Sequence, residues 1–168
     1  MSRAAQANAN IDLESDRARA RLALDQLLRP ESGLKPSGTK VLLIDDDVAD
    51  TLLIQRALQR HPHVSDVVSR NSPTRTLVEI SAGRLRPGLV FLDISMPGID
   101  GFPFLEAMRK MRKMDDVPVV FITSSAFVRD VGRAIRSSAC GYIVKPESFE
   151  ELEKQIDQAI RRAGSRLN

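Results

Sequence analysis

The sequence predicts an α/β fold in which five parallel strands form one sheet with helices on both faces. From residue 39 onward, short apolar runs alternate with longer segments whose apolar residues recur at helical spacing. The runs are apolar throughout, which is typical of strands that are buried on both sides. Strands that alternate with helices in this way predict a doubly wound parallel sheet.

The predicted strands are short and rich in Val, Ile, Leu and Phe. The first reads VLLI, the third LVFLD, the fourth VPVVFIT and the fifth GYIV, whereas the second is less apolar. In chain order they cover residues 41–44, 64–69, 89–93, 117–123 and 141–144.

Each predicted strand is followed by a predicted helix. The helices cover residues 47–60, 72–82, 101–113, the segment around 127–135 and the segment from 149 onward. Ser72 with Pro73 is an N-cap followed by proline at the first helical position, and Ser148 with Glu151 matches a capping box. The residues expected to face the sheet are Leu52, Leu53, Ala57 and Leu58, then Phe127, Val131, Ala134 and Ile135, and finally Phe149, Leu152, Ile156, Ala159 and Ile160.

An N-terminal extension over residues 1–38 precedes the main domain, which we place at residues 39–168. Residues 30–39 read PESGLKPSGT, a composition typical of a linker, and residues 11–29 have no helix breaker, which predicts an extra N-terminal helix. Its apolar residues lie within an arc of about 100° and should be buried against something, either the same chain or a second copy. These residues are Leu13, Ala20, Leu24, Leu27 and Leu28. We favour a homodimer, and a marginal helix that forms only with a partner is the alternative.

Composition argues against several functional classes. Lys and Arg number 25 against 22 Asp and Glu, the two signs are interspersed, and Trp is absent, which argues against direct DNA binding. No run approaches the about 18 apolar residues that span a membrane, and no signal peptide is evident at the N-terminus. A lone cysteine, Cys140, cannot form an internal disulfide. We therefore expect a cytoplasmic protein without a membrane segment.

Chemically distinctive residues follow four of the five predicted strands. Asp45 and Asp46 come after the first strand, Asp93 ends the third, Thr123 ends the fourth and Lys145 follows the fifth. Because ligands in such sheets bind at the carboxyl ends of the strands, these groups should converge on one rim. Clustered carboxylates suit Mg²⁺, and a carboxylate can also act as a nucleophile that forms an aspartyl phosphate. A Lys ammonium and a Thr hydroxyl suit phosphate oxygens.

Each of these residues also has an ordinary structural interpretation. An acidic residue after a strand often caps the next helix, and for Asp47 this interpretation is as good as a role in the site. A Thr at a strand end or a Lys-Pro turn is commonly structural. The combination of all of them at the ends of four strands is what indicates phosphoryl-transfer chemistry.

The segments VLLIDDD, LVFLDISMPGIDG, VVFITSS and GYIVKP resemble the signature segments of bacterial response-regulator receiver domains, over about residues 39–163. The resemblance implies a flavodoxin-like (βα)5 fold. It implies that Asp45, Asp46, Asp93 and the backbone carbonyl of Ser95 hold Mg²⁺. It further implies that Asp93 accepts phosphate from a histidine kinase or phosphotransfer protein, with Lys145 on a phosphoryl oxygen and Pro146 after a cis peptide bond. Thr123 and Tyr142 would be the switch residues.

Two alternatives to this function remain. A haloacid-dehalogenase-type phosphohydrolase would use Asp45 and Asp47 as its D-x-D motif, but no later acidic pair is present and Ala49 departs from its pattern. A receiver-like binding module that signals without phosphate would be expected to lose some of the site residues. We expect a phosphoacceptor rather than an enzyme with turnover.

No output domain follows the fifth helix in this sequence, so the expected output is a protein contact or onward phosphotransfer within a relay. The resemblance places that contact on the face built from the fourth and fifth predicted helices and the strand between them. The face would include Arg129, Arg133, Arg136, Tyr142 and Lys154.

Overall fold

The computed structural model describes residues 38–124 and 128–164, without the side chains of Val128 and Arg129. The predicted N-terminal helix, almost all of the linker and Phe127 lie outside these residues. The boundary at residue 39 and the dimer therefore stay predictions.

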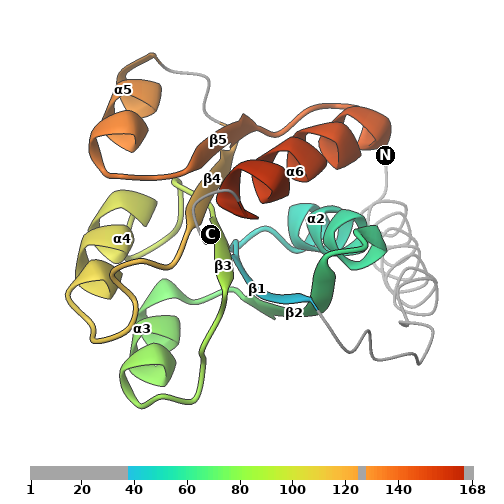
Figure 1. Cartoon of the computed structure of the whole chain (residues 1–168). Helices are drawn as coiled ribbons and strands as arrows, with labels where there is room; N and C mark the ends of the chain where they lie inside the picture. Colours follow the sequence, from blue (N-terminus) through green and yellow to red (C-terminus); the bar gives the residue numbers. More distant parts are fainter. Residues whose placement is uncertain (1–37, 125–127, 165–168) are drawn as a thin grey trace, which may run out of the picture. The chain divides into compact units, whose positions relative to one another are not determined.

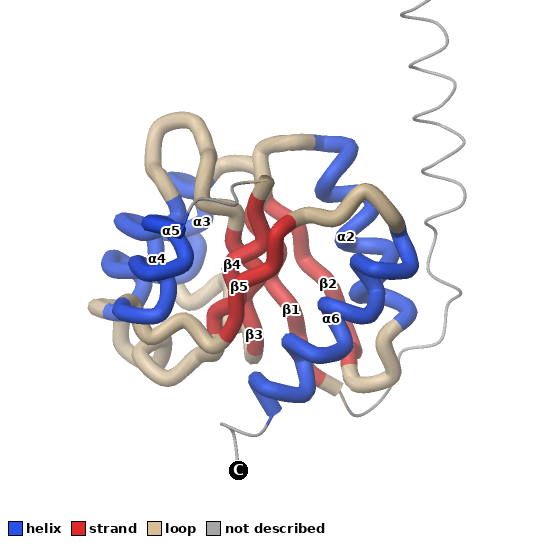
Figure 2. The backbone as a smooth tube through the Cα atoms, turned by 90° about the horizontal axis from the view of Figure 1, so that it is seen from above, coloured by secondary structure: helices blue, strands red, loops and turns tan. Residues whose placement is uncertain are grey.

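Within the described residues, five strands form one parallel sheet. They are β1 (Thr39–Ile44), β2 (Val64–Arg70), β3 (Leu89–Leu92), β4 (Val119–Thr123) and β5 (Gly141–Val144). The sheet order is β2-β1-β3-β4-β5, and every neighbouring pair is parallel. This confirms the predicted parallel sheet, and Figure 2 shows the five strands side by side in the centre of the domain.

Helices cover both faces of this sheet. They are α2 (Val48–Arg60), α3 (Pro73–Ser81), α4 (Gly101–Arg109), α5 (Val128–Arg136) and α6 (Phe149–Gly164). Helices α2 and α6 pack on one face, and α3, α4 and α5 pack on the other (Figure 1). The doubly wound, flavodoxin-like prediction is confirmed.

Alternate residues of each central strand enter opposite cores. In β1, Val41 and Leu43 pack with α2 and α6, whereas Leu42 and Ile44 pack with α3, α4 and α5. Because successive strand residues point to opposite faces, an apolar run is required where both faces are covered. All four side chains are buried.

Side-chain caps define the helix starts near the site. Asp47 accepts from the main-chain N of Asp50 at 2.8 Å and caps α2, and Asp100 accepts from Phe102 N at 3.0 Å and caps α4. Ser148 accepts from the main-chain N of Glu151 at 3.2 Å, which forms one half of the predicted capping box. The Glu151 carboxylate accepts instead from Gln155.

Helix α4 ends at Arg109, earlier than the predicted residue 113, and β4 begins at Val119 rather than 117. The cause is a tight connection in which Lys113 adopts a positive φ of 71°. The Arg109 guanidinium donates to the main-chain oxygens of Met114 and Val117 at 2.8 and 2.7 Å. These bonds satisfy main-chain carbonyl groups of the connection between α4 and β4.

Two of the predicted inward residues are wrong. Leu53 is 43% exposed while its neighbour Ile54 is buried, and Ile135 is 76% exposed while Ala134 is buried. Adjacent helical positions differ by about 100°, so one residue next to a buried face can turn to solvent. Leu152, Ile156, Ala159 and Ile160 of α6 are buried as predicted.

Candidate functional site

The site begins where β1 and β3 lie side by side at the centre of the sheet. Ile44 and Leu92 pair in register, so the residues that follow them, Asp45 and Asp93, leave the sheet next to each other. The main-chain N of Asp93 donates to Ile44 O at 2.9 Å. The chain continues from β1 into α2 on one face of the sheet and from β3 into α4 on the other face. Open α/β sheets bind ligands at such a position.

Asp45, Asp46 and Asp93 form a cluster of carboxylates at this point. Each offers an oxygen, and the three oxygens lie within 4.8 Å of one another. Asp45 and Asp93 are buried, whereas Asp46 is exposed. Three oxygen ligands with one open side suit Mg²⁺, which keeps several waters and takes few protein carboxylates.

Asp45 is held in a way that leaves one oxygen available. Its Oδ1 accepts from the main-chain N of Asp47 at 2.9 Å. Its Oδ2 lies 2.7 Å from Lys145 Nζ, an ion-pair distance, yet this buried atom accepts no hydrogen bond of ordinary geometry from the described residues. Burial raises the pKa of Asp45 to about 6, against the lowering effect of Lys145 and of the Asp47 N–H. A buried, incompletely satisfied carboxylate oxygen fits a bound cation.

One carboxylate oxygen of Asp93 is held by main-chain N–H groups, and the other faces the ammonium of Lys145. Oδ1 accepts from the main-chain N of Ile94 at 2.7 Å and lies 3.4 Å from the main-chain N of Ser95. Oδ2 lies 3.6 Å from Lys145 Nζ. Burial raises the pKa of Asp93, while Lys145 and a hydrogen bond with the buried Thr123 side chain act in the opposite direction.

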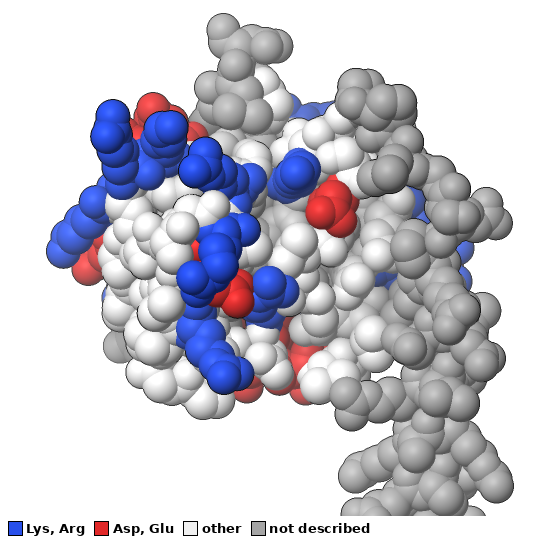
Figure 3. Space-filling view, turned by 90° about the horizontal axis from the view of Figure 1, so that it is seen from below, with Lys and Arg blue, Asp and Glu red and all other residues white. Residues whose placement is uncertain are grey.

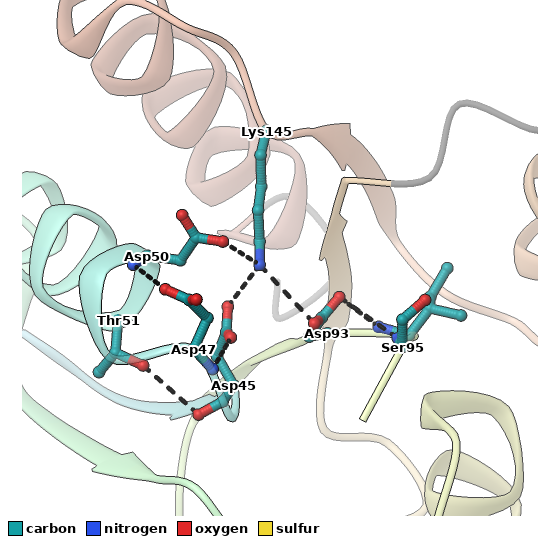
Figure 4. A network of polar contacts seen from close by, with 8 residues as sticks. Asp45, Asp47, Asp50, Thr51, Asp93, Ser95 and Lys145 are labelled. Atoms are coloured by element: carbon teal, nitrogen blue, oxygen red, sulfur yellow. Dashed lines mark hydrogen bonds and ion pairs between the residues drawn. The ribbon is translucent and has the colours of Figure 1, made fainter. Parts of the chain in front are cut away.

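Lys145 brings its ammonium into the centre of the carboxylates (Figure 4). Its main-chain N donates to Thr123 O at 2.9 Å, which joins the ends of β4 and β5. Nζ lies within 4 Å of Asp45, Asp50 and Asp93. Burial alone would lower the pKa of Lys145, but the neighbouring carboxylates of Asp45 and Asp50 raise it above its usual range.

The expected cis peptide bond before Pro146 is wrong, because the described residues contain no cis peptide. The trans form is favoured by about 0.5–1 kcal/mol even before proline. Here the trans bond is compatible with the ion pairs that hold Lys145 in the site.

The structure resolves the two interpretations of Asp47. Its carboxylate caps α2 by accepting from Asp50 N, so its contribution is structural. Sequence reasoning missed Asp50, whose Oδ2 accepts from Lys145 Nζ at 2.8 Å. It also missed Gly101, where a Cβ would overlap the Asp93 main-chain oxygen. A glycine directly after the N-cap of α4 therefore lets this helix approach the main chain at Asp93.

Tyr142 lies on the α3–α5 side of β5. It pairs in register with Phe121 and is half-buried against the core of that side. On the neighbouring α5, the Arg133 guanidinium lies 4.0 Å from the centroid of the Phe102 ring, and Arg136 is exposed. Lys154 on α6 is also exposed, and the Arg129 side chain is outside the described part of the chain.

The surface seen in Figure 3 carries Lys and Arg side chains with Asp and Glu side chains next to them. On this face the two signs are interspersed, as in the sequence. None of the helices that the structure describes has the length and apolar character required to cross a membrane.

Comparison with protein families identifies one match over most of the chain. The model of the response regulator receiver domain matches residues 41–157. The chain is 34% identical over 123 residues to the transcriptional regulatory protein AfsQ1 of Streptomyces coelicolor, covering 73% of this chain and 51% of that protein. It is 29% identical to the two-component response regulator ARR10 of Arabidopsis thaliana, covering 79% of this chain and 23% of that protein. The chain thus spans about half of the first of these relatives and less than a quarter of the second.

Solved structures of similar proteins share the fold. The phosphorylated cyanobacterial phytochrome response regulator RcpA superposes with a TM-score of 0.64 at 25% identity, covering 74% of this chain and 92% of that chain. The bacteriophytochrome response regulator RtBRR superposes with a TM-score of 0.63 at 28% identity, covering 76% and 78%.

Proposed function

This chain belongs to the response regulator receiver domain family, and from that membership we propose that it accepts a phosphoryl group on Asp93 in a two-component or phosphorelay pathway. The observation that carries the proposal is the asymmetry of the Asp93 carboxylate. Main-chain N–H groups hold Oδ1, whereas Oδ2 faces Lys145 beside the buried Asp45 carboxylate. A fixed nucleophile beside a cation suits a reaction in which positioning and charge neutralisation supply most of the catalysis.

The donor in this proposal is a phosphohistidine of a sensor kinase or phosphotransfer protein. Asp93 Oδ2 attacks phosphorus, a P–O bond forms and the P–N bond to imidazole breaks. The electron pair of that bond stays on the imidazole nitrogen, which takes a proton from solvent. The chain is an acceptor in this step and not an enzyme that turns over a free substrate.

Asp45, Asp46 and Asp93 would hold Mg²⁺, with the main-chain carbonyl of Ser95 as a further oxygen ligand. When bound, the ion neutralises charge on the phosphoryl oxygens. Lys145 would then pair with a phosphoryl oxygen, and the Thr123 hydroxyl would turn from the Asp93 carboxylate to the phosphoryl group. This new contact distinguishes two states, which a population shift requires.

The output in this proposal is a contact with a downstream protein through α5, β5 and α6. Tyr142 would report the state of Thr123 because it lies in β5, which pairs with the strand β4 that ends at Thr123. Tyr142→Ala is expected to be phosphorylated like wild type but to lose phosphorylation-dependent binding of its partner. Full, phosphorylation-dependent binding by this variant would remove the switch role.

The two alternatives have less support. The haloacid-dehalogenase-type mechanism needs Asp47 in the site, but that carboxylate caps α2. A phosphate-independent module has no need for Asp45, Asp93, Thr123 and Lys145 in one buried cluster. Hydrolysis of a phosphate-ester substrate with turnover would favour the first alternative.

The decisive experiment exposes the full chain to acetyl phosphate and Mg²⁺ and follows the intact mass. Wild type is expected to gain one phosphoryl group, and Asp93→Asn is expected to gain none. Asp47→Asn is the matched control, because it makes the same change at the same rim and Asn still caps a helix. Labelling that persists in Asp93→Asn would move the phosphoacceptor to another residue.

A further inference from the structure

The ammonium of Lys145 is unequally shared among the carboxylates around it. Asp45 Oδ2 lies at 2.7 Å but without hydrogen-bond geometry, and Asp93 Oδ2 lies at 3.6 Å, beyond hydrogen-bond distance. Within the described residues, the aligned hydrogen bond of Nζ to a carboxylate is the one to Asp50 Oδ2, at 2.8 Å. The ammonium therefore lies closer to Asp45 and Asp50, at 2.7 and 2.8 Å, than to Asp93.

Asp50 is held firmly enough to act on Lys145. It lies in the first turn of α2, and its main-chain N is fixed by the Asp47 cap at 2.8 Å. Its side chain is 35% exposed, whereas the Lys145 side chain is 12% exposed. Figure 4 shows Asp50 and Asp93 on opposite sides of the ammonium. A move of Nζ toward Asp93 is thus a move away from Asp50.

We propose that Asp50 is a positioning residue that competes with the phosphoryl group for Lys145 and so lowers the affinity of the site for that group. The inference rests on the proposed function of Asp93. A phosphoryl group on Asp93 adds negative charge on the far side of Nζ, and the pairing of Lys145 with it requires the ammonium to turn from Asp50. The Asp50 charge also repels the incoming anion, since both are within a few ångströms of the same cation.

Asp50 has a simpler possible role that makes a different prediction. An acidic residue in the first turn stabilises a helix through its dipole. In that case the removal of its charge would lower the stability of α2 and leave anion binding at Asp93 unchanged or weaker. Competition predicts instead that anion binding at Asp93 becomes stronger when the Asp50 charge is removed.

The test is the affinity of the full chain for beryllofluoride in the presence of Mg²⁺, followed by ¹⁹F NMR. Beryllofluoride is an anionic mimic of the phosphoryl group, so the measurement reports binding rather than turnover. Asp50→Asn keeps the size of the side chain but removes its charge, and it is expected to bind about three- to fivefold more tightly than wild type, the range of a partly exposed ion pair. Asp50→Glu restores the charge and is expected to return the affinity toward the wild-type value.

Asp47→Asn is the matched control, because it removes an equal charge one turn away without contact to Lys145. It is expected to bind as wild type does. Equal or weaker binding by Asp50→Asn overturns the competition, and so does an equal gain in Asp47→Asn. Asp50→Ser replaces Asp50→Asn if the latter fails to fold, with the same expected gain. A wild-type chain that does not bind beryllofluoride overturns the proposed phosphoacceptor function as well. The wild-type measurement therefore distinguishes failure of that function from failure of the competition alone.

Discussion

The two ends of α2 carry two polar clusters that are balanced very differently. At the first end, Asp45, Asp50 and Asp93 share the single ammonium of Lys145. At the other end, the buried His61 ring joins α2 to α6. Its Nδ1 accepts from the main-chain N of His63 at 3.2 Å, so Nε2 carries the hydrogen and donates to Asp157 Oδ1 at 3.1 Å. Asp157 is in turn paired with Arg161 at 2.8 Å.

The His61 cluster is close to complete in charge and in hydrogen bonds, whereas the strand-end cluster has an excess of carboxylates. A complete cluster has little to gain from a ligand. An acidic cluster with a poorly satisfied oxygen, such as Asp45 Oδ2, gains stability when a cation binds. The difference separates a polar cluster that is satisfied within the protein from one whose charge suits a bound cation.

The largest expected effect on stability is at Lys145, because its ammonium is shared by the carboxylates of Asp45, Asp50 and Asp93. Lys145→Met leaves the carboxylates of Asp45 and Asp93 buried and uncompensated, which costs about 3–5 kcal/mol of unfolding free energy in comparable sites. Chemical denaturation of the metal-free chain measures the loss. Added Mg²⁺ is expected to recover part of it, and full wild-type stability without metal would show that the cluster is not unbalanced.

Removal of the Asp45 carboxylate, in contrast, is expected to raise the free energy of unfolding of the metal-free chain. Burial raises the pKa of Asp45 to about 6. At pH 7.5 this carboxyl group is ionised in the folded chain, and its ionisation costs more free energy there than in the unfolded chain. Asp45→Asn should therefore stabilise the metal-free chain by about 3 kcal/mol, since the pKa is raised from 3.8 to about 6 and one pKa unit corresponds to about 1.4 kcal/mol. The same variant should bind Mg²⁺ at least about tenfold more weakly.

Calorimetric titration of Mg²⁺ and denaturation in a chelator separate these two effects. Asp47→Asn serves as the control for both measurements, because its carboxylate caps α2 and has no contact with Lys145. Unchanged Mg²⁺ affinity in Asp45→Asn would show that the ligands are wrongly assigned.

The sequence was sufficient to predict the sheet and most of the strand-end site. Asp45, Asp93, Thr123 and Lys145 each follow an apolar run, and the parallel topology alone brings such positions to one rim. Mg²⁺ ligation by Asp45, Asp46, Asp93 and the Ser95 carbonyl stays a prediction.

Contacts between side chains distant in the sequence could not be predicted in this way. Asp50 and Lys145 are 95 residues apart, and His61 and Asp157 are 96 apart. Nothing in the sequence around Asp50 indicates that its side chain turns toward the lysine that follows β5. The exposure of Leu53 in place of Ile54 has a similar cause, because the rotation of α2 is fixed by its packing on α6 and β1.

The smallest expected effect is a pH dependence that arises at the balanced cluster. Burial lowers the pKa of His61, although the Asp157 carboxylate acts in the opposite direction. Below about pH 6.5 the unfolded chain binds a proton at this residue that the folded chain resists. The unfolded state then holds more protons, so the free energy of unfolding falls as pH falls through this range and is fully retained above it.

Chemical denaturation of Asp45→Asn between pH 7.5 and 5.5 measures this contribution, because that background lacks the Asp45 carboxylate, which titrates in the same range with the opposite sign. Adding His61→Gln should lower stability at pH 7.5, since the bond between α2 and α6 is weakened, and should flatten the decline toward pH 5.5. His63→Gln is the comparison variant: the exposed His63 ring lies 5.5 Å from the His61 ring and lowers the His61 pKa less than burial does, so this substitution should make the decline only slightly shallower. An equally steep decline in the His61→Gln background would assign the pH dependence to another group and would remove His61 from the comparison between the two ends of α2.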